Sequence, residues 1–126
     1  MNAGRLLRWG AVAAYMAGLF LLSSWSSPVA LPEGSDKLGH LVLYAGLGAV
    51  TLCALADGRA ARVSAGACVG AVLIAVAYGA FDEYHQSFVA GRSSDLADLV
   101  ADAAGASGAA AGLKLWVILT HGRPDE

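Results

Sequence analysis

The residues of this chain that could do chemistry fall into two short segments. The first holds Asp36, Lys37, His40 and Tyr44; the spacing of four between Asp36, His40 and Tyr44 places these three on one face of a helix. In the second segment, the last three aspartates recur at spacings of three and four, which again predicts one helical face. The candidates of this second segment are Asp82, Glu83, Gln86, Arg92, Asp95, Asp98 and Asp102.

So many carboxylates in one place require compensation by cations, by protons or by a metal ion. Arg92 could bridge carboxylates of two helices, or hold a phosphate with its parallel N–H donors. His40 and Glu83 are candidates for a general acid/base pair, or for ligands of a divalent metal together with Asp82. Their spacing matches no metal-ligand motif, so the catalytic residues, the metal and any cofactor stay open.

These residues also have a structural interpretation. Asp95 and Asp98 suit the first turn of a helix, where carboxylates favour the helix dipole. His40 and Asp102 are harder to explain in this way. His40 interrupts an apolar run, and Asp102 falls about one turn inside the expected membrane boundary, where a carboxylate without a partner is costly. We therefore predict that His40 and Asp102 belong to a polar cluster, whether structural or functional.

The rest of the sequence must position these side chains, and it is strongly apolar. Of the 126 residues, 57% are hydrophobic and 14% charged, against roughly 45–50% and about a quarter in soluble domains. Residues 9–32, 38–56 and 63–81 contain no Asp, Glu, Lys or Arg. Each stretch is long enough to cross a bilayer as a helix, which takes about 17–25 residues. The composition argues against a disordered chain, a disulfide scaffold, a coiled coil and a nucleic-acid-binding protein.

We predict an all-α integral membrane protein with a single domain over residues 1–126. It is a four-transmembrane-helix bundle with spans at about residues 8–26, 38–56, 63–82 and 96–120. The fourth span is the least apolar because it contains Asp98, Asp102 and Lys114. The first span could instead be a cleaved signal peptide. Its apolar run, however, is longer than the core of about 7–15 residues that signal peptides have, which favours a retained helix.

Small residues predict where the helices begin and where they touch. Ser35 is a candidate N-cap of the second span, and Ser93 or Ser94 of the fourth. The motifs Gly66-x-x-x-Gly70 and Gly108-x-x-x-Gly112 fit the close-approach pattern of transmembrane helices, although glycine is abundant throughout the chain.

The distribution of Lys and Arg predicts the orientation. Four spans place Arg5, Arg8, Arg59, Arg62, Lys114 and Arg123 on the side of the termini, and Lys37 and Arg92 on the other side. Because cytoplasmic loops carry the excess of Lys and Arg, both termini are predicted to be cytoplasmic. The candidate residues then lie at the outward ends of the second, third and fourth spans, where we expect a shared pocket.

The two segments resemble the VanZ-like family, small bacterial membrane proteins named for a teicoplanin-resistance determinant. The resemblance covers residues from about 36 to 112. Ala90 stands where relatives commonly have proline, and Asp102 where they often have asparagine. The residues that carry the resemblance are Asp36-Lys37-Leu38-Gly39-His40 with Tyr44, and Asp82-Glu83, Gln86, Gly91-Arg92, Asp95, Asp98, Asp102 and Gly105.

The resemblance implies a multi-pass protein of the bacterial cytoplasmic membrane. Members are associated with low-level resistance to lipid-anchored glycopeptides, without altered peptidoglycan precursor termini. The partners to expect are the lipid bilayer and a lipid-linked cell-wall precursor or lipid head group, with no nucleic acid.

Two kinds of function fit the residues. One is a cell-envelope protein whose outward polar site engages such a ligand without changing it. The alternative is an integral membrane hydrolase or transferase in which His40, Asp82 and Glu83 act on a lipid-linked phosphate or ester. A proton or ion pathway ranks last, because the inner halves of the spans carry no ionisable residue apart from Lys114.

Overall fold

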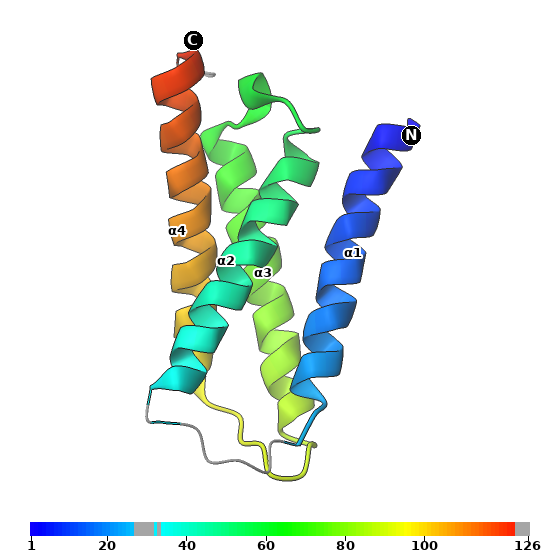
Figure 1. The fold of residues 1–126 in the computed structure, drawn as a ribbon, viewed down its shortest axis with the longest axis vertical. Helices are drawn as coiled ribbons and strands as arrows, with labels where there is room; N and C mark the ends of the chain where they lie inside the picture. The colour runs from blue at the N-terminus through cyan, green and yellow to red at the C-terminus, as the bar shows by residue number, and fades with distance from the viewer. Residues whose placement is uncertain (27–31, 33, 123–126) are drawn as a thin grey trace.

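The computed structural model describes residues 1–26, 32 and 34–122, and within these residues it contains helices and no strand (Figure 1). The elements are α1 (Ala3–Ser23), α2 (Ser35–Leu55), the 3-10 turn η1 (Ala60–Arg62), α3 (Ala65–Gln86) and α4 (Leu96–His121). Each of the four α-helices is long and apolar enough to cross a membrane. The predicted all-α fold with four membrane-spanning helices is confirmed.

The four helices run alternately up and down. The start of α1, the end of α4 and the connection from α2 to α3 lie at one end of the bundle, here called the terminal end (Figure 1). The end of α1, the start of α2 and the connection from α3 to α4 lie at the opposite end, here called the site end. Helices α2, α3 and α4 pack on one another, whereas α1 lies beside α2 and α3. Arg123, which counts toward the predicted orientation, lies outside the described residues.

Helices α1 and α3 extend furthest beyond their predicted limits. α1 begins at Ala3 rather than near residue 8, because the Asn2 side chain caps it by accepting a hydrogen bond of 2.9 Å from the backbone N–H of Arg5. α3 continues past residue 82 to Gln86, with Asp82, Glu83 and Gln86 buried inside the bundle. Polar residues therefore end the apolar stretch without ending the helix.

Both capping predictions are wrong. Ser35 lies in the first turn of α2, and its hydroxyl donates to the carbonyl of Pro32 at 2.7 Å. The N-cap is Gly34, whose φ of 84° is a left-handed conformation that glycine adopts without strain. Asp95, rather than Ser93 or Ser94, caps α4, since its Oδ1 accepts a hydrogen bond of 2.9 Å from the backbone N–H of Ala97.

α2 and α4 make the closest helix pair of the bundle. A Cβ atom on Gly105 would collide with the backbone carbonyl oxygen of Leu41, and one on Gly48 would lie 2.8 Å from Cα of Ala106. Glycine at both positions lets the two backbones approach, which is how helices associate in a membrane without a hydrophobic driving force.

The glycines of the predicted close-approach motifs do not make this contact. Within the described part of the chain, a Cβ on Gly108 or Gly112 would meet no other atom within 4 Å. A Cβ on Gly66 would approach only the hydroxyl of Ser64, and one on Gly70 would touch the side chain of Leu55 at 3.3 Å. The motifs have the right spacing but largely lie on faces that other helices do not cover.

α1 is attached by tyrosine hydroxyls and by an ion pair. The Tyr15 hydroxyl donates to the carbonyl of Leu43 in α2 at 2.8 Å, and the Tyr78 hydroxyl of α3 donates to the carbonyl of Met16 at 2.6 Å. At the terminal end, Arg8 pairs with Asp57 in the turn after α2. This hydrogen bond from the guanidinium holds the pKa of the Asp57 carboxyl below its usual range.

Gly105→Ala should lower the free energy of unfolding by about 3 kcal/mol, because the new methyl group meets the α2 backbone rather than a movable side chain. Gly108→Ala is the matched control in the same helix. It should raise the stability by up to about 1 kcal/mol, because alanine favours the helix and the site is open. Unfolding of the purified proteins in detergent measures both changes. Equal effects of the two substitutions would contradict this account of the α2–α4 contact.

Candidate functional site

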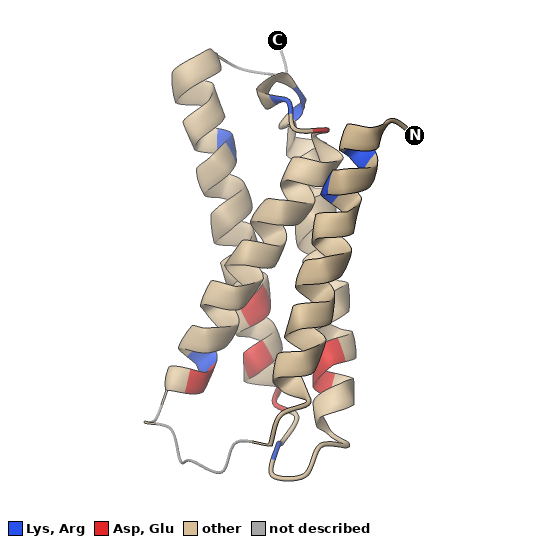
Figure 2. Ribbon diagram, turned by 45° about the vertical axis from the view of Figure 1, so that its right-hand side comes forward, with Lys and Arg blue, Asp and Glu red and all other residues tan. Residues whose placement is uncertain are grey.

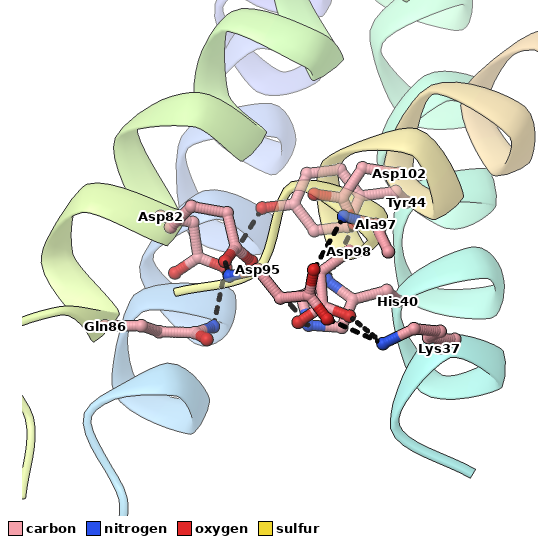
Figure 3. Close-up of polar contacts among 10 residues, drawn as sticks. Lys37, His40, Tyr44, Asp82, Gln86, Asp95, Ala97, Asp98 and Asp102 are labelled. Atoms are coloured by element: carbon pink, nitrogen blue, oxygen red, sulfur yellow. Dashed lines mark hydrogen bonds and ion pairs between the residues drawn. The ribbon is translucent and has the colours of Figure 1, made fainter. Parts of the chain in front are cut away.

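Polar side chains from three helices meet at the site end of the bundle. Figure 2 shows most acidic residues gathered there and most basic residues at the terminal end. The polar cluster, as we call it, consists of Lys37, His40, Tyr44, Asp82, Glu83, Gln86, Asp95, Asp98 and Asp102 (Figure 3). Apart from Lys37 and Asp95, none of these residues is more than 7% exposed. Bulk water therefore has little access to them, and they depend largely on partners within the bundle.

His40 of α2 is the centre of the cluster. Its Nδ1 lies 2.7 Å from Oδ1 of Asp102 in α4. We assign the ring proton to Nδ1, since an ionised carboxylate can only accept a hydrogen bond. Nε2 then presents its lone pair toward two further carboxylates, with Oδ2 of Asp98 at 3.6 Å and Oε1 of Glu83 at 3.9 Å. An imidazole oriented by a carboxylate is suited to proton transfer or to metal binding.

Glu83 and Lys37 tie the start of α4 to the other two helices. Oε2 of Glu83 accepts a hydrogen bond of 2.9 Å from the backbone N–H of Asp95. The Lys37 ammonium donates to Asp95 at 3.0 Å and to Asp98 at 3.1 Å. The hydrogen bond from the Ala97 N–H, followed by that from Lys37, lowers the pKa of the Asp95 carboxyl. Asp95 is therefore ionised at neutral pH and loses these interactions only in acid.

Asp82 lies on a separate branch of the cluster. Its Oδ2 accepts hydrogen bonds from the Tyr44 hydroxyl at 3.1 Å and from the Gln86 amide at 3.5 Å (Figure 3). Asp82 and Glu83 are adjacent in sequence but point to different partners, because neighbouring residues of a helix face different directions. The carboxylates that lie near the His40 ring are therefore those of Glu83, Asp98 and Asp102, and not that of Asp82.

Arg92 and Asp36 lie at the edge of the cluster. The Arg92 guanidinium donates to the backbone carbonyl of Trp25 at 3.4 Å. Among the described residues it pairs with no carboxylate, so the predicted bridge between two helices is not formed. Asp36 is exposed, yet its carboxylate lies within 4.8 Å of a ring nitrogen of His40 and of a carboxylate oxygen of Asp98.

A pocket of about 180 Å³ opens beside the cluster, between α1, α2 and α3. One part of its lining is apolar, from Leu19, Leu22 and Leu43, whereas the other part is polar. The polar lining consists of Ser23, Ser35, Asp36, His40, Tyr44, Asp82, Gln86 and Arg92. Sequence reasoning missed the wall from α1, because a uniformly apolar helix gives no signal of which face it turns to a neighbour.

Some carboxylate oxygens of the cluster remain without a hydrogen bond from the described residues, although they are buried. They are Oδ1 of Asp82, Oε1 of Glu83 and Oδ2 of Asp102. Gly79 in α3 leaves room for the last of these, since a Cβ there would lie 2.7 Å from Oδ2 of Asp102. A buried carboxylate oxygen without a partner carries a desolvation penalty. The site therefore has capacity to accept a proton, a cation or a ligand donor.

The fold and the cluster together define a class: a small multi-pass membrane protein with a buried histidine–carboxylate site near one end of its helices. The sequence model of the VanZ/LLP1 family matches residues 8–119, which is most of the chain. The chain belongs to the VanZ/LLP1 family, and the predicted resemblance is confirmed. No curated protein and no solved structure matches it.

Asp102→Ala should lower the free energy of unfolding by about 2–3 kcal/mol, because it leaves the Nδ1–H of His40 buried without an acceptor. Asp102→Asn keeps an acceptor oxygen in nearly the same shape and should retain most of the stability. Unfolding in detergent compares the two, and the ¹⁵N chemical shifts of the His40 ring report its tautomer. If both variants lose the same stability, Asp102 does not act through the imidazole.

Proposed function

We propose that this VanZ-family protein engages an amphiphilic ligand of the bacterial cell envelope in the pocket at the site end. The ligand is a lipid head group or a lipid-linked cell-wall precursor. The observation that carries the proposal is the pocket lining. Leucines from α1 and α2 form a wall for hydrocarbon, and His40, Gln86 and Arg92 supply polar groups for a head group beside it.

The charge distribution supports an outward-facing pocket in the cytoplasmic membrane. Arg5, Arg8, Arg59 and Arg62 lie at the terminal end of the bundle (Figure 2). The site end carries only Lys37 and Arg92 among the described residues. By the positive-inside rule, the terminal end faces the cytoplasm and the pocket opens at the outer boundary of the membrane.

A contribution to teicoplanin-type resistance follows from this position. A lipid-anchored glycopeptide and the precursor that it binds both meet at the outer boundary of the membrane. A protein that engages either lipid anchor there would reduce the binding of the glycopeptide to the precursor without altering the precursor termini.

The second candidate is a hydrolase or transferase for a lipid-linked phosphate or ester. It is supported by the contact between His40 and Asp102, which would orient the imidazole for acid–base chemistry, with Glu83 as the nearby carboxylate. Loss of the function on His40→Ala, with intact ligand binding, would favour this enzyme over the binding protein.

Cysteine labelling tests the orientation. Cys53 and Cys68 are first replaced by alanine, and a single cysteine is then placed at the exposed positions Ser94 or Ala61. A membrane-impermeant maleimide added to intact cells should label the Ser94→Cys protein and leave the Ala61→Cys protein unlabelled until the cells are opened. Labelling of the Ala61→Cys protein alone from outside would reverse the orientation.

Filling the pocket should abolish ligand engagement. Gly39 lines the pocket, and a Cβ there would meet nothing within 4 Å, so the side chain of Gly39→Leu has room at its first atom and should extend into the pocket. Mass spectrometry of protein purified in mild detergent should find a specific amphiphile on the unaltered chain and lose it from Gly39→Leu. In cells, the same variant should lose any increase in the inhibitory concentration of teicoplanin.

Gly108→Leu is the matched control for this experiment. It introduces the same side chain at an open helical position of α4 that is away from the pocket. This variant should keep both the amphiphile and the resistance. Equal binding of the same lipids by both variants would show that the pocket is not the site of engagement.

A further inference from the structure

We propose that the polar cluster binds a divalent transition-metal ion, Zn²⁺ in the first instance. His40 Nε2 and Glu83 Oε1 are two of its ligands, Asp102 orients the imidazole, and Asp98 is the further carboxylate beside the same ring nitrogen. The site is distinct from the amphiphile pocket in its ligands, although both share His40. The proposal therefore goes beyond the proposed function and is testable without any lipid.

The distances around Nε2 are the first observation. Hydrogen bonds to nitrogen span about 2.7–3.2 Å, and Nε2 lies beyond that range from both Glu83 at 3.9 Å and Asp98 at 3.6 Å. Zinc binds histidine nitrogen and carboxylate oxygen at about 2.0–2.2 Å in a tetrahedral arrangement, so two of its ligand atoms lie roughly 3.3–3.6 Å apart. The gap to Asp98 fits this spacing, and the gap to Glu83 exceeds it slightly, by an amount that a small side-chain movement closes.

The unpartnered oxygen of Glu83 is the second observation. The Glu83 side chain is 8% exposed, and its Oε2 is held by the backbone N–H of Asp95. Its Oε1 faces the His40 ring and accepts no hydrogen bond from the described residues. A buried carboxylate fixed by one oxygen, with the other oxygen free, is positioned as a metal ligand.

The orientation of His40 is the third observation. Histidines that bind metals almost always donate their other ring N–H to a carboxylate or carbonyl, which fixes the ring and its tautomer. The contact of 2.7 Å between Nδ1 and Asp102 provides this partner and leaves Nε2 for the ion. Asp102 is fully buried and contacts Nδ1, whereas Glu83 and Asp98 both lie near Nε2, the other ring nitrogen.

Charge balance favours a cation at this point. Lys37 pairs with Asp95 and Asp98 on the exposed side of the cluster. Lys37 makes no contact with Glu83 or Asp102. Among the described residues, these two carboxylates meet only the His40 ring within ion-pair distance, and a ring with its lone pair on Nε2 carries no charge to offset theirs. Buried carboxylates are stable when they are paired or coordinate a metal, and a divalent ion would compensate Glu83 and Asp98 together.

The donor atoms select the kind of metal. An imidazole nitrogen with carboxylate oxygens suits Zn²⁺ and related transition ions, whereas Ca²⁺ and Mg²⁺ prefer sites built from oxygen alone. An ion can enter from the pocket side, where His40 and Asp36 form part of the lining. Donor atoms of Asp36, His40 and Asp98 lie within 4.8 Å of one another, so Asp36 marks the open side of the site.

The test uses the full chain purified in detergent, stripped with a chelator and reloaded with ZnCl₂. Elemental analysis should find about one zinc ion per chain, and competition with a chromophoric chelator gives the affinity. Glu83→Gln keeps the shape of the side chain and should weaken zinc binding by about tenfold or more. His40→Ala should abolish binding, and an excess of CaCl₂ should not displace the zinc.

Asp82→Asn is the matched control, because Asp82 is a neighbouring acid of α3 that is equally buried but faces Tyr44 and Gln86. It should bind zinc as the unaltered chain does, and thermal unfolding confirms that each variant is folded. If His40→Ala does not fold, Glu83→Gln carries the test. Failure of the unaltered chain to take up zinc, or equal losses in Glu83→Gln and Asp82→Asn, would overturn the proposal. The proposed function is tested separately. If Gly39→Leu kept the amphiphile, that result would count against the pocket and not against the metal site, because zinc binding is measured without a lipid ligand.

Discussion

The contact between His40 and Asp102 is the interaction on which the arrangement of the site depends. Asp102 is fully buried in a helix that is apolar enough to cross a membrane, where a carboxylate without a partner is costly. His40 reaches it only because α2 and α4 lie unusually close together. That closeness depends in turn on Gly105, which has no side chain to hold the α2 backbone away at Leu41. A glycine that makes no polar contact thus determines whether a buried acid is satisfied.

α3 contributes to the same site in two ways. Ala71, Ala75 and Gly79 recur every four residues and form the buried face of the helix. Gly79 gives space to the Asp102 carboxylate, and the following turn brings Asp82 and Glu83 into the bundle. The small residues of α3 let this helix approach α4. The acids at the end of α3 can therefore lie close to those of α4.

Much of this could be predicted from the sequence, because it rests on composition and helical spacing. Long uncharged stretches predict the helices, and the spacing of His40 with Tyr44 predicts their common face. Pairwise geometry could not be predicted. The direction in which Asp82 and Glu83 point depends on the rotation of α3 about its axis, which the helical period leaves open. For the same reason, the glycines chosen by spacing were wrong, whereas Gly48 and Gly105 lie at the crossing of α2 and α4. Caps were also wrong, because Gly34 and Asp95 compete with nearby serines that have similar propensities.

The depth of the charges separates a structural part of the cluster from a reactive part. On the exposed side, Lys37 and Asp95 form ion pairs in contact with water, which contribute little stability but fix the start of α4 against α2. Further inside, Glu83 and Asp102 share a single imidazole and keep one oxygen each without a hydrogen bond from the described residues. A purely structural cluster would be expected to pair its deepest charges first, because the desolvation penalty is largest there. Here the shallow charges are paired and the deep ones have fewer partners among the described residues, which supports the proposal that the cluster binds a cation.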